Sequence, residues 1–261
     1  MTVTDRAWQQ YVKTLSAIDK TAARKFEAYV RTLNWGKASS TNKAIRYAIR
    51  LAEIYGESAA AAACEMYDAI ATAAGVYFPA AEPALLEENI QAMRKDVAKT
   101  VQGMINQQAS PESMGSAVGR LVKRTGADTT LKNAIRDGAQ FAWIPSGDSC
   151  AFCIMLASNG WQYASRKALH NGHAEHIHAN CDCTYAIRFD NETEYKSYDP
   201  QKYLDMYEAA DEDGGRWQDR VNVMRRQQYA ENKDKINEQK REAYAARQER
   251  LGEDKKTETK A

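Results

Sequence analysis

The sequence predicts a mainly α-helical protein. Helix breakers are scarce, because the 261 residues include only 14 glycines and 5 prolines. Alanine, glutamate, lysine, glutamine and arginine, which favour helices, are abundant. The clearest helix has apolar residues at intervals of three and four from Trp8 to Leu33, the spacing of a single buried helix face. We therefore expect a helix some thirty residues long at the start of the chain.

A change of composition at residue 142 divides the chain. Glycine, asparagine, aspartate, cysteine and histidine become frequent from Trp143 to Phe189, whereas the residues beyond 190 are first acidic and tyrosine-rich and then become a polar helix. We expect an elongated helical region at 1–141 and a small irregular Cys/His-stapled domain with short strands at 142–190. A linker and a long polar C-terminal helix, with a disordered tail from Gly252, are expected at 191–261.

Within the N-terminal region the capping residues and breakers set the expected helix limits. Thr4 is the expected cap of the first helix, and Ser110-Pro111 pairs a capping serine with proline at the first helical position. Gly56 and Gly126 are expected to interrupt their helices. Helices are accordingly expected at 4–33, 39–55, 56–75, 85–107, 111–123 and 128–141, and the alternation of residues 184–189 predicts a strand.

Composition excludes several classes of function. The formal net charge is +1, with 27% charged and 44% hydrophobic residues, so the whole chain has no electrostatic attraction to nucleic acid or membrane. No apolar run reaches about 18 residues, the minimum for a membrane-spanning helix. The start, Met1 to Asp5, has no pattern of a signal peptide. We expect a protein made in a cytoplasm, where thiols stay reduced, with no membrane partner.

The main chemical motif consists of two clusters of metal-ligating residues. Cys150 and Cys153 form a CxxC, and His178, Cys181 and Cys183 form an HxxCxC about 24 residues later. Zinc is held tetrahedrally by four such ligands. We expect one structural zinc on the CxxC pair, His178 and one further cysteine, for which Cys183 is favoured over Cys181. A set of all four cysteines is the alternative. Structural zinc contributes on the order of 10 kcal/mol or more to folding.

Other interpretations of this motif stay open. A disulfide framework would suit a protein that works outside the cell, as a virion component does. His173-Ala174-Glu175 supplies the HxE of zinc deaminases, but there the cysteine pair follows the histidine, whereas here the CxxC precedes it. A zinc hydrolase or deaminase is therefore disfavoured, and we expect no enzymatic activity. A zinc-knuckle nucleic-acid-binding protein is the alternative function, although the segment around the motif is not basic.

The residues of this motif resemble the minor head proteins of tailed bacteriophages. The resemblance includes Trp143-Ile144-Pro145, Cys150 through Ser158, Gly160 and Tyr163, and His178-Ala179-Asn180-Cys181-Asp182-Cys183. It covers about residues 136–190 and is similar to the Mu F-like head morphogenesis family, whose pattern is CxxC followed by HxxCxC. Alanine follows His178 and aspartate precedes Cys183, where many relatives have proline and arginine.

The resemblance implies a structural role without catalysis. Members of that family are low-copy head components associated with the portal, which act in head assembly and in genome packaging or delivery. It implies the portal protein, and the major capsid protein or scaffold, as partners. The expected location is the virion head, and the host cytoplasm during assembly.

The C-terminal helix has a mild excess of positive charge. Residues 220–261 contain 12 lysines and arginines against 8 aspartates and glutamates, so their net charge is 12 − 8 = +4. Aliphatic residues are few. One interpretation is a solvated single helix stabilised by i,i+4 charge pairs. The other is a docking arm that contacts the portal, the scaffold or phage DNA.

Overall fold

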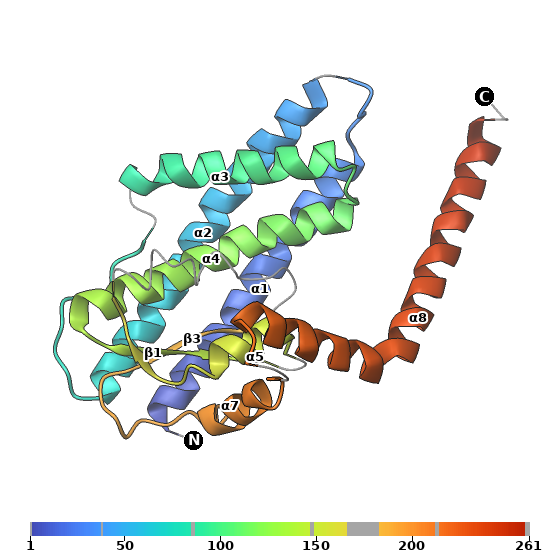
Figure 1. Ribbon diagram of the computed structural model, residues 1–261. Helices are drawn as coiled ribbons and strands as arrows, with labels where there is room; N and C mark the ends of the chain where they lie inside the picture. The colour runs from blue at the N-terminus through green and yellow to red at the C-terminus, as the bar shows by residue number, and fades with distance from the viewer. Residues whose placement is uncertain are drawn as a thin grey trace.

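The computed structural model describes residues 2–37, 39–84, 87–146, 149–165, 183–211 and 214–258, and it is mainly helical, as predicted (Figure 1). The long helices are α1 (Val3–Arg31), α2 (Ser39–Ala73), α3 (Glu87–Asn106), α4 (Pro111–Asp137) and α8 (Trp217–Glu258). The shorter elements are α5 (Ala151–Ala157), α7 (Pro200–Glu208), β1 (Gln140–Ile144), β2 (Gln162–Tyr163) and β3 (Thr184–Arg188).

Helix α1 confirms the predicted apolar stripe. Its buried face includes Trp8, Tyr11, Leu15, Ala22 and Phe26. The cap differs from the prediction, because Thr2 and not Thr4 caps the helix. The Thr2 hydroxyl accepts a hydrogen bond from the Asp5 N–H at 3.0 Å, which satisfies one of the unpaired donors at the helix start.

Helix α2 is continuous through Gly56, which the sequence analysis expected to interrupt it. Gly56 is buried, and so are Ala52 and Ala59 on either side of it. A glycine inside a helix costs only about 1 kcal/mol relative to alanine. Burial of the surrounding apolar residues outweighs that cost, so the two helices predicted at 39–55 and 56–75 are one.

Helix α4 is also continuous, and its glycines serve close packing against α1. A Cβ atom at Gly115 would lie 2.6 Å from the Ala23 carbonyl oxygen, and one at Gly119 would lie 2.9 Å from that of Asp19. At Gly126 a Cβ would lie 2.8 Å from the Tyr11 hydroxyl oxygen. Gly126 therefore allows this close approach without breaking the helix. The prediction that Gly126 interrupts the helix is wrong. The helix ends at Gly138, whose φ of 69° is left-handed.

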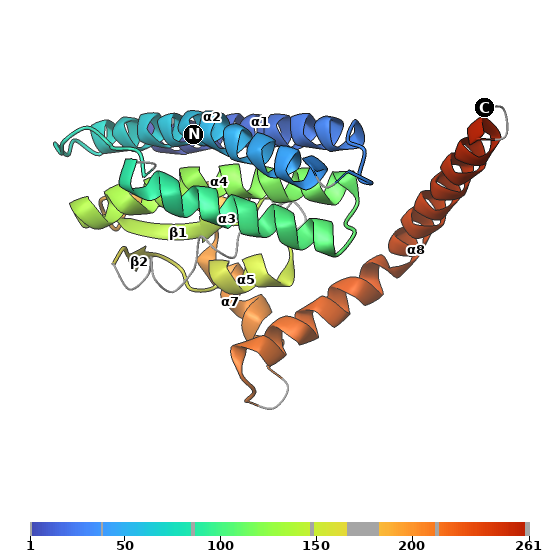
Figure 2. The ribbon, with the colours of Figure 1, turned by 90° about the horizontal axis from the view of Figure 1, so that it is seen from above.

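The described strands form an antiparallel sheet in the order β2-β1-β3. Strand β3 confirms the predicted strand, whereas β1 begins at Gln140, where the sequence predicted the end of a helix. Ala142 pairs with Ala186, and Trp143 pairs with Tyr185. Figure 2 shows the sheet between the α1–α4 helices on one side and α5 with α7 on the other.

The sheet shares a hydrophobic core with the N-terminal helices. Trp8 of α1 and Leu131 of α4 lie in the same cluster as Trp143, Tyr185 and Cys183. The Trp8 indole N–H donates to the Tyr185 carbonyl oxygen at 3.0 Å. Described residues of segment 142–190, which was predicted as a separate stapled domain, therefore pack their apolar side chains against the helical region. The described residues do not support stapling by cysteine and histidine.

Helix α8 starts on the body of the protein and then leaves it. Val221 and Met224 pack against Ala151 and Ile154 of α5. Both views show the C-terminal half of α8 projecting away from the other elements (Figures 1 and 2). The sequence predicts disorder from Gly252, whereas the structure extends α8 to Glu258.

Among the described residues, no helix combines the length and the apolar character needed to cross a membrane.

Candidate metal centre

The CxxC motif lies at the beginning of α5. Cys150 is the N-cap residue with extended backbone angles, φ −69° and ψ 158°, and Cys153 lies in the first turn. Cys150 is half-buried, whereas Cys153 is 1% exposed. The sequence analysis expected irregular structure with short strands in this region, and the structure instead begins a helix here. The helix start keeps the two thiols three residues apart on one short element.

Strand pairing brings Cys183 to the same region. Cys183 directly precedes β3, and the next residue, Thr184, pairs with Ile144 at the end of β1. The Ser146 N–H donates a hydrogen bond to the Cys183 sulfur at 3.2 Å. Ser146 is four residues before Cys150 in the chain. The antiparallel β1–β3 pair therefore returns Cys183 to the segment that leads into the CxxC.

Three of the five predicted ligands contact the same large hydrophobic core. Cys153 and Cys183 are buried within that core, and Cys150 packs against it as a partly buried residue. The other two predicted ligands, His178 and Cys181, lie outside the described residues. The residues that the structure does describe include no group of three or more side chains placed to hold a metal ion. A complete site would require ligands from residues 166–182.

A glutamine of α8 contacts both sides of Cys150, which the sequence analysis missed. The Gln228 side-chain amide donates to the Ser149 carbonyl oxygen at 3.0 Å. Its carbonyl oxygen accepts from the Ala151 N–H at 3.1 Å. The start of α5 therefore depends on α8. A single glutamine in a polar helix gives no signal in the sequence, although Val221 and Met224 do indicate a buried face at the start of α8.

Tyr203 of α7 lies near Cys183. Burial raises the pKa of Tyr203, and the neighbouring Cys183 and Asp199 add to the increase. Tyr203 also packs against the core that contains Cys183. Helix α7 therefore covers part of this region and limits its contact with water.

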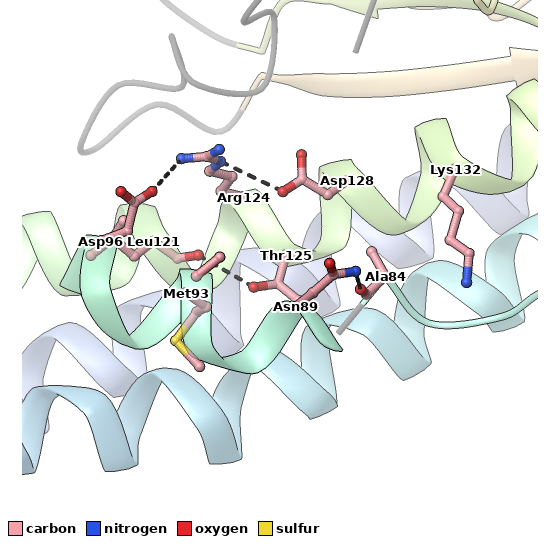
Figure 3. Close-up of a pocket in the computed structure, with 10 residues that line it drawn as sticks. Ala84, Asn89, Met93, Asp96, Leu121, Arg124, Thr125, Asp128 and Lys132 are labelled. Carbon is pink, nitrogen blue, oxygen red and sulfur yellow. Dashed lines mark hydrogen bonds and ion pairs between the residues drawn. The ribbon is translucent and has the colours of Figure 1, made fainter. Parts of the chain in front are cut away.

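A separate groove lies between α3 and α4, with a volume of about 380 Å³ (Figure 3). Arg124 lies between two carboxylates, at 3.1 Å from Asp96 and 3.5 Å from Asp128. Lys132, at the other end, pairs with Glu82 at 3.1 Å. The charges that line the groove are therefore matched within the chain. Asp96 and Arg124 are 28 residues apart, so no sequence pattern indicated their pairing.

Comparison with known proteins gives one match. No curated protein and no solved structure matches the chain significantly. The family model described as VG15 protein matches residues 2–210, which include α1 to α7 and the sheet but not α8. The family takes its name from a viral gene 15 protein, which points to a phage-encoded protein and is less specific than the Mu F-like resemblance. Because the match covers most of the sequence, the chain belongs to the VG15 protein family.

Proposed function

We propose that this protein is a minor head component of a tailed bacteriophage, with a structural role in head assembly near the portal. The observation that carries the proposal is the match of residues 2–210 to a viral protein family, in a chain whose residues 136–190 resemble the motif of phage minor head proteins. Its proposed partners are the portal protein and the major capsid protein or scaffold, and its proposed location is the virion.

The architecture suits a part that is built into an assembly. The close approach of α1 and α4 at Gly115 and Gly119 makes a rigid body. Helix α8 extends beyond that body and offers surface to a partner (Figure 2). The charged side chains of the groove between α3 and α4 are paired with one another. We therefore propose a non-enzymatic role.

We also propose that the cysteines of the CxxC and HxxCxC motifs hold one structural zinc. Cys150, Cys153 and Cys183 would contribute thiolates, and His178 or Cys181 would complete four ligands. The N–H of Ser146 that donates to the Cys183 sulfur is the kind of outer contact that orients a metal-bound thiolate. When bound, the metal would fix the two ends of the segment between Cys153 and Cys183.

Co-expression tests the role in the head. The full chain is produced together with the portal protein, and separately with the major capsid protein, of the same phage. Size-exclusion chromatography then measures whether the two proteins elute together. We expect a stable complex with the portal protein. A monodisperse monomer with no affinity for either protein would contradict the proposal.

A further inference from the structure

The acidic residues of α8 gather on one face once the helix leaves the body, whereas the basic residues are spread more widely. The acidic face is exposed and consists of Glu231, Asp234, Glu238 and Glu242. Their spacing of three and four residues is that of a single helix face. Arg226, Lys233 and Lys240 are also exposed and recur every seven residues, which is close to two helical turns. The sequence repeats a basic residue once more at position 247.

Exposed tyrosines lie among these basic residues. The Lys240 ammonium nitrogen is 5.9 Å from the centroid of the Tyr229 ring, which places the two side chains on one side of the helix. Tyr244 follows Lys240 by one turn and shares that side. Tyr229 is 46% exposed and Tyr244 is 65% exposed. We call the surface formed by Tyr229, Lys233, Lys240 and Tyr244 the basic face.

This face lies beyond the part of α8 that packs on the body. Contacts of α8 with the body involve Val221, Val223, Met224 and Gln228. Beyond them the helix projects outward in both views (Figures 1 and 2). The side chains whose exposure is described there are mostly charged, polar or aromatic. Among them there is no apolar seam of the kind that a coiled-coil partner requires.

The spacing and chemistry of the basic face suit a regular polyanion. Positive charges seven residues apart are separated by about 10.5 Å along a helix axis. Lysine and arginine bind phosphates through charge, and tyrosine hydroxyls can donate hydrogen bonds to phosphate oxygens. The acidic face on the opposite side disfavours insertion into a groove, where phosphates would approach from both sides. It permits contact along one side of a duplex.

We propose that the basic face of α8 binds the phosphate backbone of duplex DNA without reading its sequence. The inference is independent of the proposed head function. It concerns a segment outside the family match, which ends at residue 210. Net charge alone does not account for such binding, because the whole chain carries only +1. The face that carries Lys233 and Lys240 has basic residues without acidic ones, and it provides the attraction.

Two lysines of the same helix give a matched comparison. Lys233 lies on the basic face, whereas Lys235 lies four residues after Glu231 and three before Glu238, on the acidic face. Both are exposed, and Lys233→Gln and Lys235→Gln remove the same charge. Binding of the full-length variants to a fluorescent duplex of random sequence is measured by anisotropy over a range of salt concentrations. Circular dichroism checks that the helix content is unchanged.

We expect the full chain to bind duplex DNA at low salt. Lys233→Gln should weaken binding and reduce the slope of log K against log salt by about 0.9, the effect of one lost phosphate contact. Lys235→Gln should leave the slope unchanged. Equal losses in the two variants, or no binding of the unmodified chain at low salt, would overturn the proposal. Binding to poly-glutamate in place of DNA would overturn it in favour of an acidic protein partner.

Discussion

Gln228 of α8 forms hydrogen bonds with the backbone on both sides of Cys150, accepting from the Ala151 N–H at 3.1 Å and donating to the Ser149 carbonyl at 3.0 Å. Ala151 is fully buried, and both of these hydrogen bonds are partly buried. The first residues of a helix have N–H groups without partners in the helix itself. Gln228 supplies one of these partners from a distant element and thereby joins α8 to the segment that carries the CxxC motif.

Gln228→Ala should therefore destabilise the protein. The buried Ala151 N–H would lose its acceptor, which costs about 1–3 kcal/mol. Urea denaturation followed by circular dichroism measures the change in the free energy of unfolding. Asn232→Ala, one turn further along α8, removes an exposed side chain that bonds only to the Gln228 carbonyl in the described contacts, and it is the control. Equal stability of the two variants would show that the Gln228 contacts contribute nothing.

Alanine at Gly115 should also be destabilising. The added Cβ would lie 2.6 Å from the Ala23 carbonyl oxygen, so α1 and α4 must move apart, at a typical cost of about 1–3 kcal/mol. Gly103→Ala in α3 is the matched control, because its Cβ would meet nothing within 4 Å. That substitution should stabilise the protein by up to about 1 kcal/mol through helix propensity. Thermal unfolding of the two variants should shift in opposite directions, and a shift in the same direction contradicts the close packing of α1 and α4.

Stability should decrease at high pH because of buried tyrosines. Burial raises the pKa of Tyr11 from 10.0 to about 12. Between these values the unfolded chain loses the phenolic proton while the folded chain keeps it, so the folded state binds more protons. The stability is fully present below about pH 10 and is lost as the pH rises to about 12, by about 3 kcal/mol for this residue. Urea denaturation over this interval should show a smaller loss for Tyr11→Phe, and an unchanged dependence would refute the role of Tyr11.

The sequence predicted α1 and β3 because each has a regular apolar pattern facing one surface. It did not predict the continuity of α4, because that helix is buried on several sides and has no single apolar face. Gly126 and Thr130 are both buried in it, although each residue type is a poor helix former in isolation. Tertiary packing overrides local preference at these positions.

The candidate site was predictable only in part. The sequence indicated Cys150, Cys153 and Cys183 as candidate ligands, and the pairing of β1 with β3 returns Cys183 to the segment that precedes the CxxC. The described residues alone form no metal-binding group, so the ligand set stays a prediction. Gln228 and the Asp96–Arg124 pair could not be predicted. Both join distant segments through ordinary polar residues whose sequence neighbours carry no distinguishing pattern.

The zinc proposal predicts metal in protein purified under reducing conditions. Cys150→Ser should release it and loosen residues 142–190 while the N-terminal helices stay formed. Cys64→Ser is the control, since Cys64 lies in α2, far from the motif in sequence. Elemental analysis measures the metal content. His178→Ala distinguishes the two ligand sets: the loss of zinc affinity should be large if His178 is a ligand and small if the four cysteines are the ligands. Absence of metal, together with a Cys150–Cys183 bridge in the virion, would favour disulfides.

Mass spectrometry of purified phage particles tests the central claim most directly. Particles are separated from free protein on a density gradient, and peptides from the chain are counted relative to those of the major capsid and portal proteins. The proposed head function predicts that peptides from α1 to α8 are present in intact particles, at an abundance near that of the portal protein. If particles that carry both the capsid and portal proteins lack the chain, its assignment as a minor head component is wrong.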